Sequence, residues 1–238
     1  AATRASGTTT VRYGAMRENV LGLVAVTGNG DEIHTGTYTT KGVVGYDLTR
    51  LLIGSEGTLA IVTQATLRLT PLPESRRTLQ AVYDSVRAAA AAVSRLMAQP
   101  VTPCALEFMD AAAIEMIRNY SRVELPQGAG ALLMIELDGP EAAMETAVAT
   151  ISAATRGEGL LSLAAAKTKS EAAALWAARK ALSPALRSLA PNKLNEDVVV
   201  PVSRIPELIG GLEQLSREFA KPLHRAAGEP VSLTCPAP

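Results

Sequence analysis

Residues 54–74 read GSEGTLAIVTQATLRLTPLPE, and this stretch sets both a strand pattern and a domain boundary. Thr58 to Leu69 is a β-rich run whose second half alternates between apolar and polar residues, which is typical of a strand with one buried face. We expect the apolar positions of that half to face a core: Ala65, Leu67 and Leu69. Two prolines, Pro71 and Pro73, then stop regular structure. The sequence therefore predicts one domain over residues 1–73 and a second that begins at residue 74.

The segment before this boundary is rich in glycine, threonine and valine and predicts a small β-containing region. Leu21 to Val26 has the composition of a strand, and Glu32 to Thr35 is its expected partner. Residues 28–31, Gly-Asn-Gly-Asp, predict the turn between them because glycine and asparagine tolerate positive φ. We therefore expect a hairpin that precedes the strand of residues 58–69.

Residues 74–222 alternate short apolar runs with alanine-rich helical patterns. The expected strands are 79–83, 105–109, 132–137, 160–163 and 197–200, and the expected helix starts are Asp84 or Ser85, Asp110, Pro140, Ser170 with Glu171, and Ser203. Such alternation fits a parallel doubly wound sheet or β-α-β units on one antiparallel, ferredoxin-like sheet. No dinucleotide-binding glycine fingerprint follows these runs, so the pattern favours the α+β class. Residues 223–238 lack periodicity and predict an irregular tail.

The composition excludes several classes of function. The chain of 238 residues carries 23 Lys and Arg against 23 Asp and Glu, so no excess of positive charge indicates a nucleic-acid partner or an anionic membrane surface. No apolar stretch reaches the length of a transmembrane helix. Cys104 and Cys235 are too far apart for a metal motif or a disulfide framework, and we expect a buried Cys104 in a reducing, cytoplasmic setting.

Two glycine-containing segments offer backbone groups to a ligand. Exposed N–H groups in the turn that opens Gly54–Val62 can bind phosphate or a carbonyl-rich ring, and Thr3–Thr8 combines small hydroxyl residues with glycine. The alternatives are a glycine turn that leads into a strand and a frayed terminus. The residues by themselves leave these alternatives open.

A third candidate is a helical arginine. Arg179 follows Trp176 by about one turn, and a guanidinium can bind a carboxylate through two parallel hydrogen bonds. A solvated arginine beside a core tryptophan is the alternative. Residues 193–197 form either a charged site at the start of a strand or a polar loop. With His34 and His224 as the only histidines, a metal site built from histidines is not expected.

Taken together, four segments resemble the FAD-linked oxidase family, which includes D-lactate dehydrogenase and the flavin subunit of glycolate oxidase, within the p-cresol methylhydroxylase/vanillyl-alcohol oxidase superfamily. The resemblance extends over residues 2–222. Its segments are ATRASGTTTVRYGAMRENVLGL (2–23), GYDLTRLLIGSEGTLAIVTQATLRL (45–69), ALWAARKALSPAL (174–186) and NEDVVVPVSRIP (195–206).

The resemblance implies a fold and a set of binding residues. Residues 1–73 would be the second half of a PCMH-type FAD-binding domain, and residues 74–222 an incomplete substrate cap with a ferredoxin-like antiparallel sheet. Flavin contacts, largely through the backbone, are implied for Thr3, Arg4, Ala5, Ser6, Gly7, Glu56, Gly57, Thr58, Leu59, Ala60, Ile61 and Val62. Ala60 departs from the glycine that the family usually has there, and its methyl group could tighten or disturb the flavin fit. Substrate contacts are implied for Arg179, Ser183 and Lys193.

The implied chemistry is hydride transfer from the α-carbon of a D-2-hydroxy acid, such as D-lactate or glycolate, to FAD. An electron-acceptor protein or a quinone would reoxidise the flavin, with the protein in the cytoplasm or peripheral at the inner membrane. The family's glycine-rich pyrophosphate loop and its histidine motifs do not occur in the sequence, so we expect a chain truncated at both ends with impaired activity. It would associate with itself or with the missing FAD half.

Two other classes of function stay open. The chain could be a non-catalytic α+β binding or assembly module that kept the cap fold, because an open flavin surface would expose apolar groups and favour association. It could also be a nucleotide-binding regulatory domain, for which only the strand–helix pattern speaks.

Overall fold

The computed structural model describes residues 1–39, 41–120, 127–189 and 198–223. These form two compact units, Ala1–Leu72 and Pro73–Pro238, which are described separately. The expected tail, apart from Leu223, and the histidine and cysteine within it lie outside the described residues.

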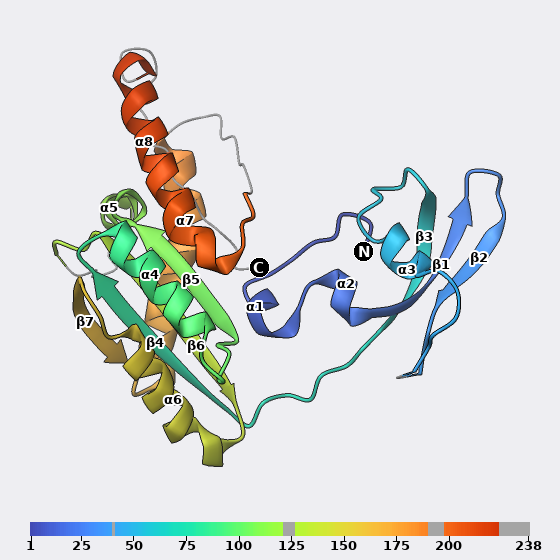
Figure 1. The fold of residues 1–238 in the computed structure, drawn as a ribbon, viewed down its shortest axis with the longest axis horizontal. Helices are drawn as coiled ribbons and strands as arrows, with labels where there is room; N and C mark the ends of the chain where they lie inside the picture. Colours follow the sequence, from blue (N-terminus) through green and yellow to red (C-terminus); the bar gives the residue numbers. More distant parts are fainter. Residues whose placement is uncertain (40, 121–126, 190–197, 224–238) are drawn as a thin grey trace. The chain divides into compact units, whose positions relative to one another are not determined.

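The first unit is built on a three-stranded antiparallel sheet. Its elements are α1 (Thr10–Tyr13), α2 (Met16–Asn19), β1 (Val20–Thr27), β2 (Glu32–Gly36), α3 (Leu48–Leu52) and β3 (Ala60–Leu67). The strand order is β2-β1-β3, with β1 in the centre (Figure 1). The predicted hairpin is confirmed, since Val26 pairs with Glu32 and Gly30 takes a φ of 88° in the turn.

The face of β3 that the alternation predicted to be buried is exposed. Ala65 is exposed, Leu67 is 51% exposed and Leu69 is 89% exposed, so this prediction is wrong. β3 is an edge strand, and the short helix α3 packs on β1 and β2 instead. A register shift in the pairing with β1, between Val24 and Ala25, also interrupts the alternation. The buried position of β3 is Ala60, which is 5% exposed.

The second unit is a four-stranded sheet covered by helices. Its elements are β4 (Ser75–Tyr83), α4 (Val86–Met97), β5 (Ala105–Asp110), α5 (Ala111–Tyr120), β6 (Ala131–Gly139), α6 (Glu141–Thr155), β7 (Leu160–Ala165), α7 (Lys169–Leu189), the 3-10 turn η1 (Val202–Arg204) and α8 (Ile205–Leu223). The order is β5-β6-β4-β7 and every pair is antiparallel. The α+β prediction is therefore confirmed for this unit, and the parallel doubly wound alternative is excluded.

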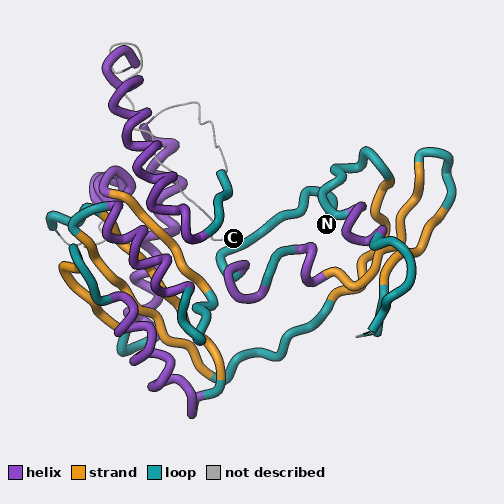
Figure 2. Tube along the Cα trace, viewed as in Figure 1, coloured by secondary structure: helices purple, strands orange, loops and turns teal. Residues whose placement is uncertain are grey.

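Helices cover both faces of this sheet, as the ribbon and the tube show (Figures 1 and 2). On one face, α4 and α6 bury a cluster that includes Leu79, Leu133 and Ile135. On the other face, α5 and α7 bury a cluster that includes Val82 and Leu132. β6 is thus apolar on both sides, which explains its nearly continuous hydrophobic sequence. We call the second face the α7 face.

Four of the five strands predicted in this unit are confirmed, and the fifth is wrong. Residues 198–200 form no strand, and Val199 is 72% exposed. A run of valines has strand propensity, but a strand also needs a partner for its backbone groups. In the described part of the chain, residues 198–200 pair with neither edge of the sheet.

Local helix signals were partly right. Ser85 accepts a hydrogen bond from the Ala88 N–H, and Asp110 accepts one from the Ala113 N–H, as predicted. For α7 the cap is Thr168 rather than Ser170, because its hydroxyl accepts from the Glu171 N–H. Ser203 lies within the 3-10 turn that precedes α8, so it is not the cap of that helix.

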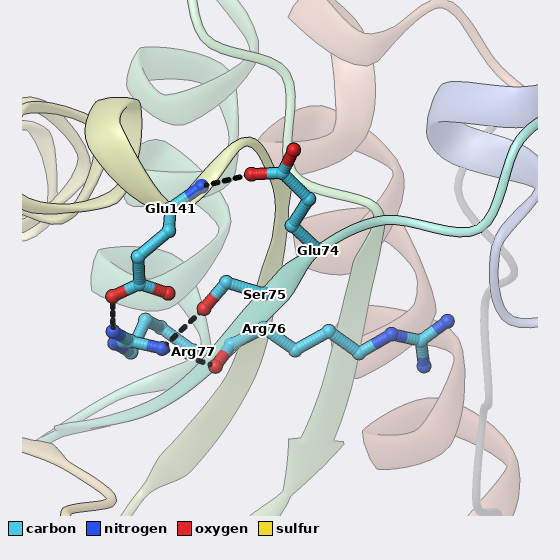
Figure 3. Close-up of polar contacts among 5 residues, drawn as sticks. All are labelled: Glu74, Ser75, Arg76, Arg77 and Glu141. Carbon is cyan, nitrogen blue, oxygen red and sulfur yellow. Dashed lines mark hydrogen bonds and ion pairs between the residues drawn. The ribbon is translucent and has the colours of Figure 1, made fainter.

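A polar cluster ties the start of β4 to the start of α6 (Figure 3). Pro140 offers no side-chain acceptor to cap α6, and Glu74 takes this role by accepting from the Glu141 N–H at 3.1 Å. Arg77 joins the cluster through Nη2, 2.6 Å from Glu141 Oε1, and through Nη1, 2.5 Å from Ser75 Oγ. The segment after the prolines is therefore fixed to the second unit.

This cluster gives a pH-dependent contribution to stability. The Ser75 hydroxyl and the Arg77 guanidinium hold the pKa of Glu141 below its ordinary value of 4.5. A lowered pKa in the folded state means that the contact stabilises above the ordinary pKa and that this contribution is lost as pH falls through the folded-state pKa. We expect Glu141→Gln to lower the melting temperature at about pH 7, and we expect this effect to shrink as the pH falls below 4.5 and through the lowered folded-state pKa. Glu145→Gln, at an exposed position of the same helix, is the control, and a loss that persists in acid would contradict the assignment.

A buried hydroxyl ties β4 to the end of α6. Tyr83 is fully buried and donates to the Thr155 carbonyl at 2.7 Å, and burial raises the pKa of Tyr83 to about 12. Tyr83→Phe leaves that carbonyl without its donor, so we expect a loss of about 1–2 kcal/mol in the free energy of unfolding. Urea denaturation measures this loss. Tyr46→Phe, at a side chain that is 96% exposed, should change nothing, and equal effects of the two variants would disprove the role of the hydrogen bond.

Candidate functional site

Two segments far apart in the sequence meet in the first unit. The Gly54 N–H donates to the Ala1 carbonyl at 3.2 Å, and the Glu56 N–H donates to the Ala2 carbonyl at 3.0 Å. The structure therefore brings together the two loops that the sequence marked as candidates for a ligand, residues 1–7 and 54–58.

These two loops share an unusual backbone shape. Arg4 and Glu56 have φ values of 50° and 51° without being glycine, and Gly54 and Gly57 have φ values of 87° and 81°. A non-glycine residue in this region costs about 1 kcal/mol or more and is often found at binding sites. Turns with positive φ also direct successive N–H groups to one side, where they can bind anionic or carbonyl oxygens.

The junction has room and polar capacity for a ligand. A Cβ atom added at Gly57 would meet nothing within 4 Å, whereas one at Gly54 would lie 3.2 Å from Arg4 Cβ. Gly54 thus allows the two loops to approach, and Gly57 borders open space. Among the described residues, Ser55 Oγ is buried without a hydrogen-bond partner. Buried hydroxyl groups nearly always have partners, so this atom suits a polar group bound at the junction. On these observations, the loops fit a cofactor rich in carbonyl and phosphate oxygens.

The remaining predicted flavin contacts divide into exposed and buried positions. Residues 3–7 are exposed, and so are Leu59 (49%) and Ile61 (69%). Thr58 donates its hydroxyl to the Ser55 carbonyl and closes the turn. The methyl group of Ala60 packs in the core of the first unit, together with Leu23, Leu52 and Ile53. Its methyl group thus occupies core space, and the effect of Ala60 on the flavin fit stays a prediction.

In the second unit, Arg179 lies on the buried side of α7. It is four residues after Leu175 and three before Leu182, and both leucines pack in the cluster of the α7 face. Trp176 is partly buried in the same cluster. Arg179 Nε lies 2.6 Å from Glu107 Oε2, and the side chains are 27% and 11% exposed. Arg179 is therefore partly buried and paired, rather than a fully solvated arginine.

The α7 face is apolar at one end and polar at the other. Along β6, Leu132 and Met134 are followed by Glu136 and Asp138, and alternate strand residues share a face. On β5, Glu107 lies across from Met134. On β4, Arg76 lies across from Asp138, Thr78 across from Glu136, and Gln80 across from Met134. The polar end, as we name it, comprises Arg76, Thr78, Gln80, Glu107, Glu136 and Asp138.

Several members of the polar end are buried. Counted over the whole residue, main chain included, Thr78 is 3%, Asp138 4% and Glu107 8% exposed. Charged groups rarely lie on a buried sheet face, because removing them from water is costly. Glu107 was not among the residues predicted from the sequence. Its only signal was one charged residue in the apolar run of β5.

Cys104 borders the polar end, and its environment disfavours the reactive thiolate. It is buried, as predicted, and its thiol lies 3.7 Å from Glu136 Oε2. Burial, with the nearby charges of Asp138 and Glu136, raises the pKa of Cys104 to about 12. Because only the thiolate is reactive, this cysteine stays an inert thiol.

Two further substrate contacts, Ser183 and Lys193, stay predictions. Ser183 lies on α7 one turn after Arg179, and its side chain is not among the described ones. Lys193 lies outside the described residues. In the described part of the chain, no group of three His, Cys, Asp or Glu side chains could hold a metal ion. No described helix is both long and apolar enough to span a bilayer.

The sequence model of FAD linked oxidases, C-terminal domain, matches residues 72–228. The chain belongs to the FAD-linked oxidase family. "Glycolate oxidase subunit GlcD" of Bacillus subtilis is 41% identical over 209 residues, which are 88% of this chain and 44% of that protein. "D-lactate dehydrogenase" of Archaeoglobus fulgidus is 34% identical over 220 residues, 92% of this chain and 48% of that protein. The chain thus spans less than half the length of these relatives.

A solved structure supports the fold of this FAD-linked oxidase family member. Alkyldihydroxyacetonephosphate synthase superposes with a TM-score of 0.57 at 20% identity, over 79% of this chain and 35% of that one. At this identity the likeness concerns the fold alone.

The position of Ala60 gives a test in the first unit. Ala60→Gly introduces the residue that the family usually has, but it removes a buried methyl group and adds backbone freedom, so we expect a loss of about 1 kcal/mol in stability. Flavin affinity, measured by fluorescence quenching of added FAD, should not improve. A variant that binds FAD more tightly would show that the methyl group faces the cofactor instead of the core.

Proposed function

We propose that this chain is part of a flavoenzyme that oxidises a D-2-hydroxy acid, of the D-lactate or glycolate type, with FAD as cofactor. The observation that carries the proposal is Arg179, held on a largely buried sheet face by Glu107 in a chain of this family. Bound FAD would supply the acceptor for the hydride of the substrate α-carbon. The residues of the chain bind, orient and shield the reactants.

The first unit would contribute to the cofactor site. In this proposal residues 1–73 are the C-terminal part of a PCMH-type FAD-binding domain. The Arg4, Gly54 and Glu56 N–H groups already donate to the carbonyls of residues 1 and 2. The Gly57 turn, which borders open space, and the unpartnered Ser55 hydroxyl are the groups that this proposal assigns to the cofactor. These groups suit the carbonyl-rich ring or the phosphates of FAD. The proposed contacts are residues 3–7 and 56–62.

The second unit would contribute the substrate site. In this proposal residues 74–222 are the substrate cap of the oxidase. The guanidinium of Arg179 binds the substrate carboxylate through paired hydrogen bonds, while the surrounding apolar cluster limits access of water. Ser183, one turn along α7, and Lys193 are proposed as further substrate ligands.

Exposed apolar side chains support the proposal of a partner. Ile61 and Leu67 on β3, with Leu69 and Leu72 beyond it, are 51–92% exposed. Large apolar side chains exposed in one segment are often part of an interaction site. We propose that it is covered by the remaining part of a complete FAD-binding domain, whether on the same polypeptide or on another one. The glycolate oxidase relative is itself named a subunit, which supports assembly with further subunits. An electron-carrier protein or a quinone is the proposed acceptor.

A non-catalytic binding module is the second candidate function, and the same exposed apolar side chains favour it. Size-exclusion chromatography separates the two candidates when it is combined with flavin absorbance. Self-association without flavin binding would favour the module, whereas flavin binding with turnover of D-lactate or glycolate by an artificial acceptor would favour the oxidase. Because the chain spans less than half the length of its relatives, we expect weak FAD binding and slow turnover from the chain by itself.

The role of Arg179 is directly testable. Arg179→Lys keeps the charge but loses the planar pair of donors, so we expect the dissociation constant for D-lactate to rise about tenfold or more. Isothermal titration calorimetry on the purified full chain measures this constant. Arg204→Lys, at an exposed arginine on η1, is the matched control. Equal binding by Arg179→Lys and the unmodified chain would rule out the assigned role.

A further inference from the structure

Glu107 is a buried carboxylate at the boundary between the apolar part and the polar end of the α7 face. It lies in the middle of β5, is 8% exposed, and faces the same side of the sheet as Met109, whose side chain is in the apolar cluster. Across the strand pair it lies opposite Met134. A carboxylate in such a place requires a cation and hydrogen bonds to offset its desolvation. Arg179 provides both, which makes the orientation of one side chain dependent on the other.

The geometry of the contact leaves part of the guanidinium available. Glu107 Oε2 accepts from Nε of Arg179 at 2.6 Å. An arginine has five N–H donors in a rigid plane, and four of them belong to the two terminal nitrogens. A carboxylate that holds Nε therefore fixes the plane of the guanidinium and still leaves a two-nitrogen edge that fits a second carboxylate.

We propose that Glu107 is a positioning residue for 2-hydroxy-acid binding: it holds Nε of Arg179 so that the terminal nitrogens bind the substrate carboxylate. This inference rests on the proposed function of Arg179. It differs from a purely electrostatic role, because a negative charge beside Arg179 by itself weakens the attraction for an anionic substrate. Glu107 therefore contributes through geometry, against its own charge.

Two substitutions separate geometry from charge. Glu107→Asp keeps the negative charge but shortens the side chain by one methylene, so the 2.6 Å contact cannot form without moving the guanidinium. Glu107→Gln removes the charge but retains an oxygen of the same reach that can accept from Nε. If Glu107 positions Arg179, D-lactate binding should weaken about tenfold or more in Glu107→Asp, since a misplacement of about 1 Å is costly. It should stay within about threefold in Glu107→Gln.

The experiment is calorimetric titration of D-lactate into the full chain and its variants, with thermal melts to confirm that each variant is folded at the assay temperature. Glu136→Gln is the matched control, because it removes a carboxylate from the same polar end. Glu136 Oε2 lies 3.7 Å from Arg76 Nη1 and pairs with that arginine. Unchanged binding in Glu107→Asp with tighter binding in Glu107→Gln would overturn the inference in favour of a charge effect. If Arg179→Lys loses binding while Glu107→Asp does not, the inference fails and the proposed function stands. No binding of D-lactate by the unmodified chain would overturn the proposed function, and this inference with it.

Discussion

The antiparallel pairing of β4 with β6 is the constraint on which the second unit depends. The two strands run in register from Ser75 opposite Gly139 to Tyr83 opposite Ala131. In such a ladder, opposite residues share a face, so this one register divides the side chains of both strands between the two faces. Leu79 and Ile135 then lie under α4 and α6, while Val82 and Leu132 lie under α7. A register shift of β6 by one residue would move Glu136 and Asp138 into the apolar cluster under α4 and α6.

The same register explains why a charged site exists on a buried face. β6 ends in Glu136 and Asp138 on the α7 side, and β5 adds Glu107 beside them. The apolar half of this face binds α7 through Leu175 and Leu182, which fixes the helix so that Arg179 reaches the polar half. The packing of a few leucines thus places a guanidinium on a carboxylate. Arg179 and Glu107 are 72 residues apart in the sequence, and no local interaction connects them.

The two units offer different chemistry to a ligand. The first has a turn with positive φ at Gly57, beside open space, and such turns suit phosphate or carbonyl oxygens. The second presents the side chain of Arg179, which suits a carboxylate. A flavin-dependent oxidation of a hydroxy acid requires both kinds of binding, since the cofactor and the substrate differ in this way. Family membership and local geometry therefore favour the same proposal.

Features that local periodicity and turn chemistry control were predictable from the sequence. The hairpin of the first unit, four strands of the second, the caps at Ser85 and Asp110, and the family were all predicted from it. It failed where a strand needs a partner, as at residues 198–200, or a face needs a cover, as at Leu67 and Leu69. Three features became known from the folded chain: the strand order of the second sheet, the burial of Ala60, and the pairing of Arg179 with Glu107. These depend on contacts between distant segments, and a charged residue in an apolar run does not reveal which cation will lie opposite it.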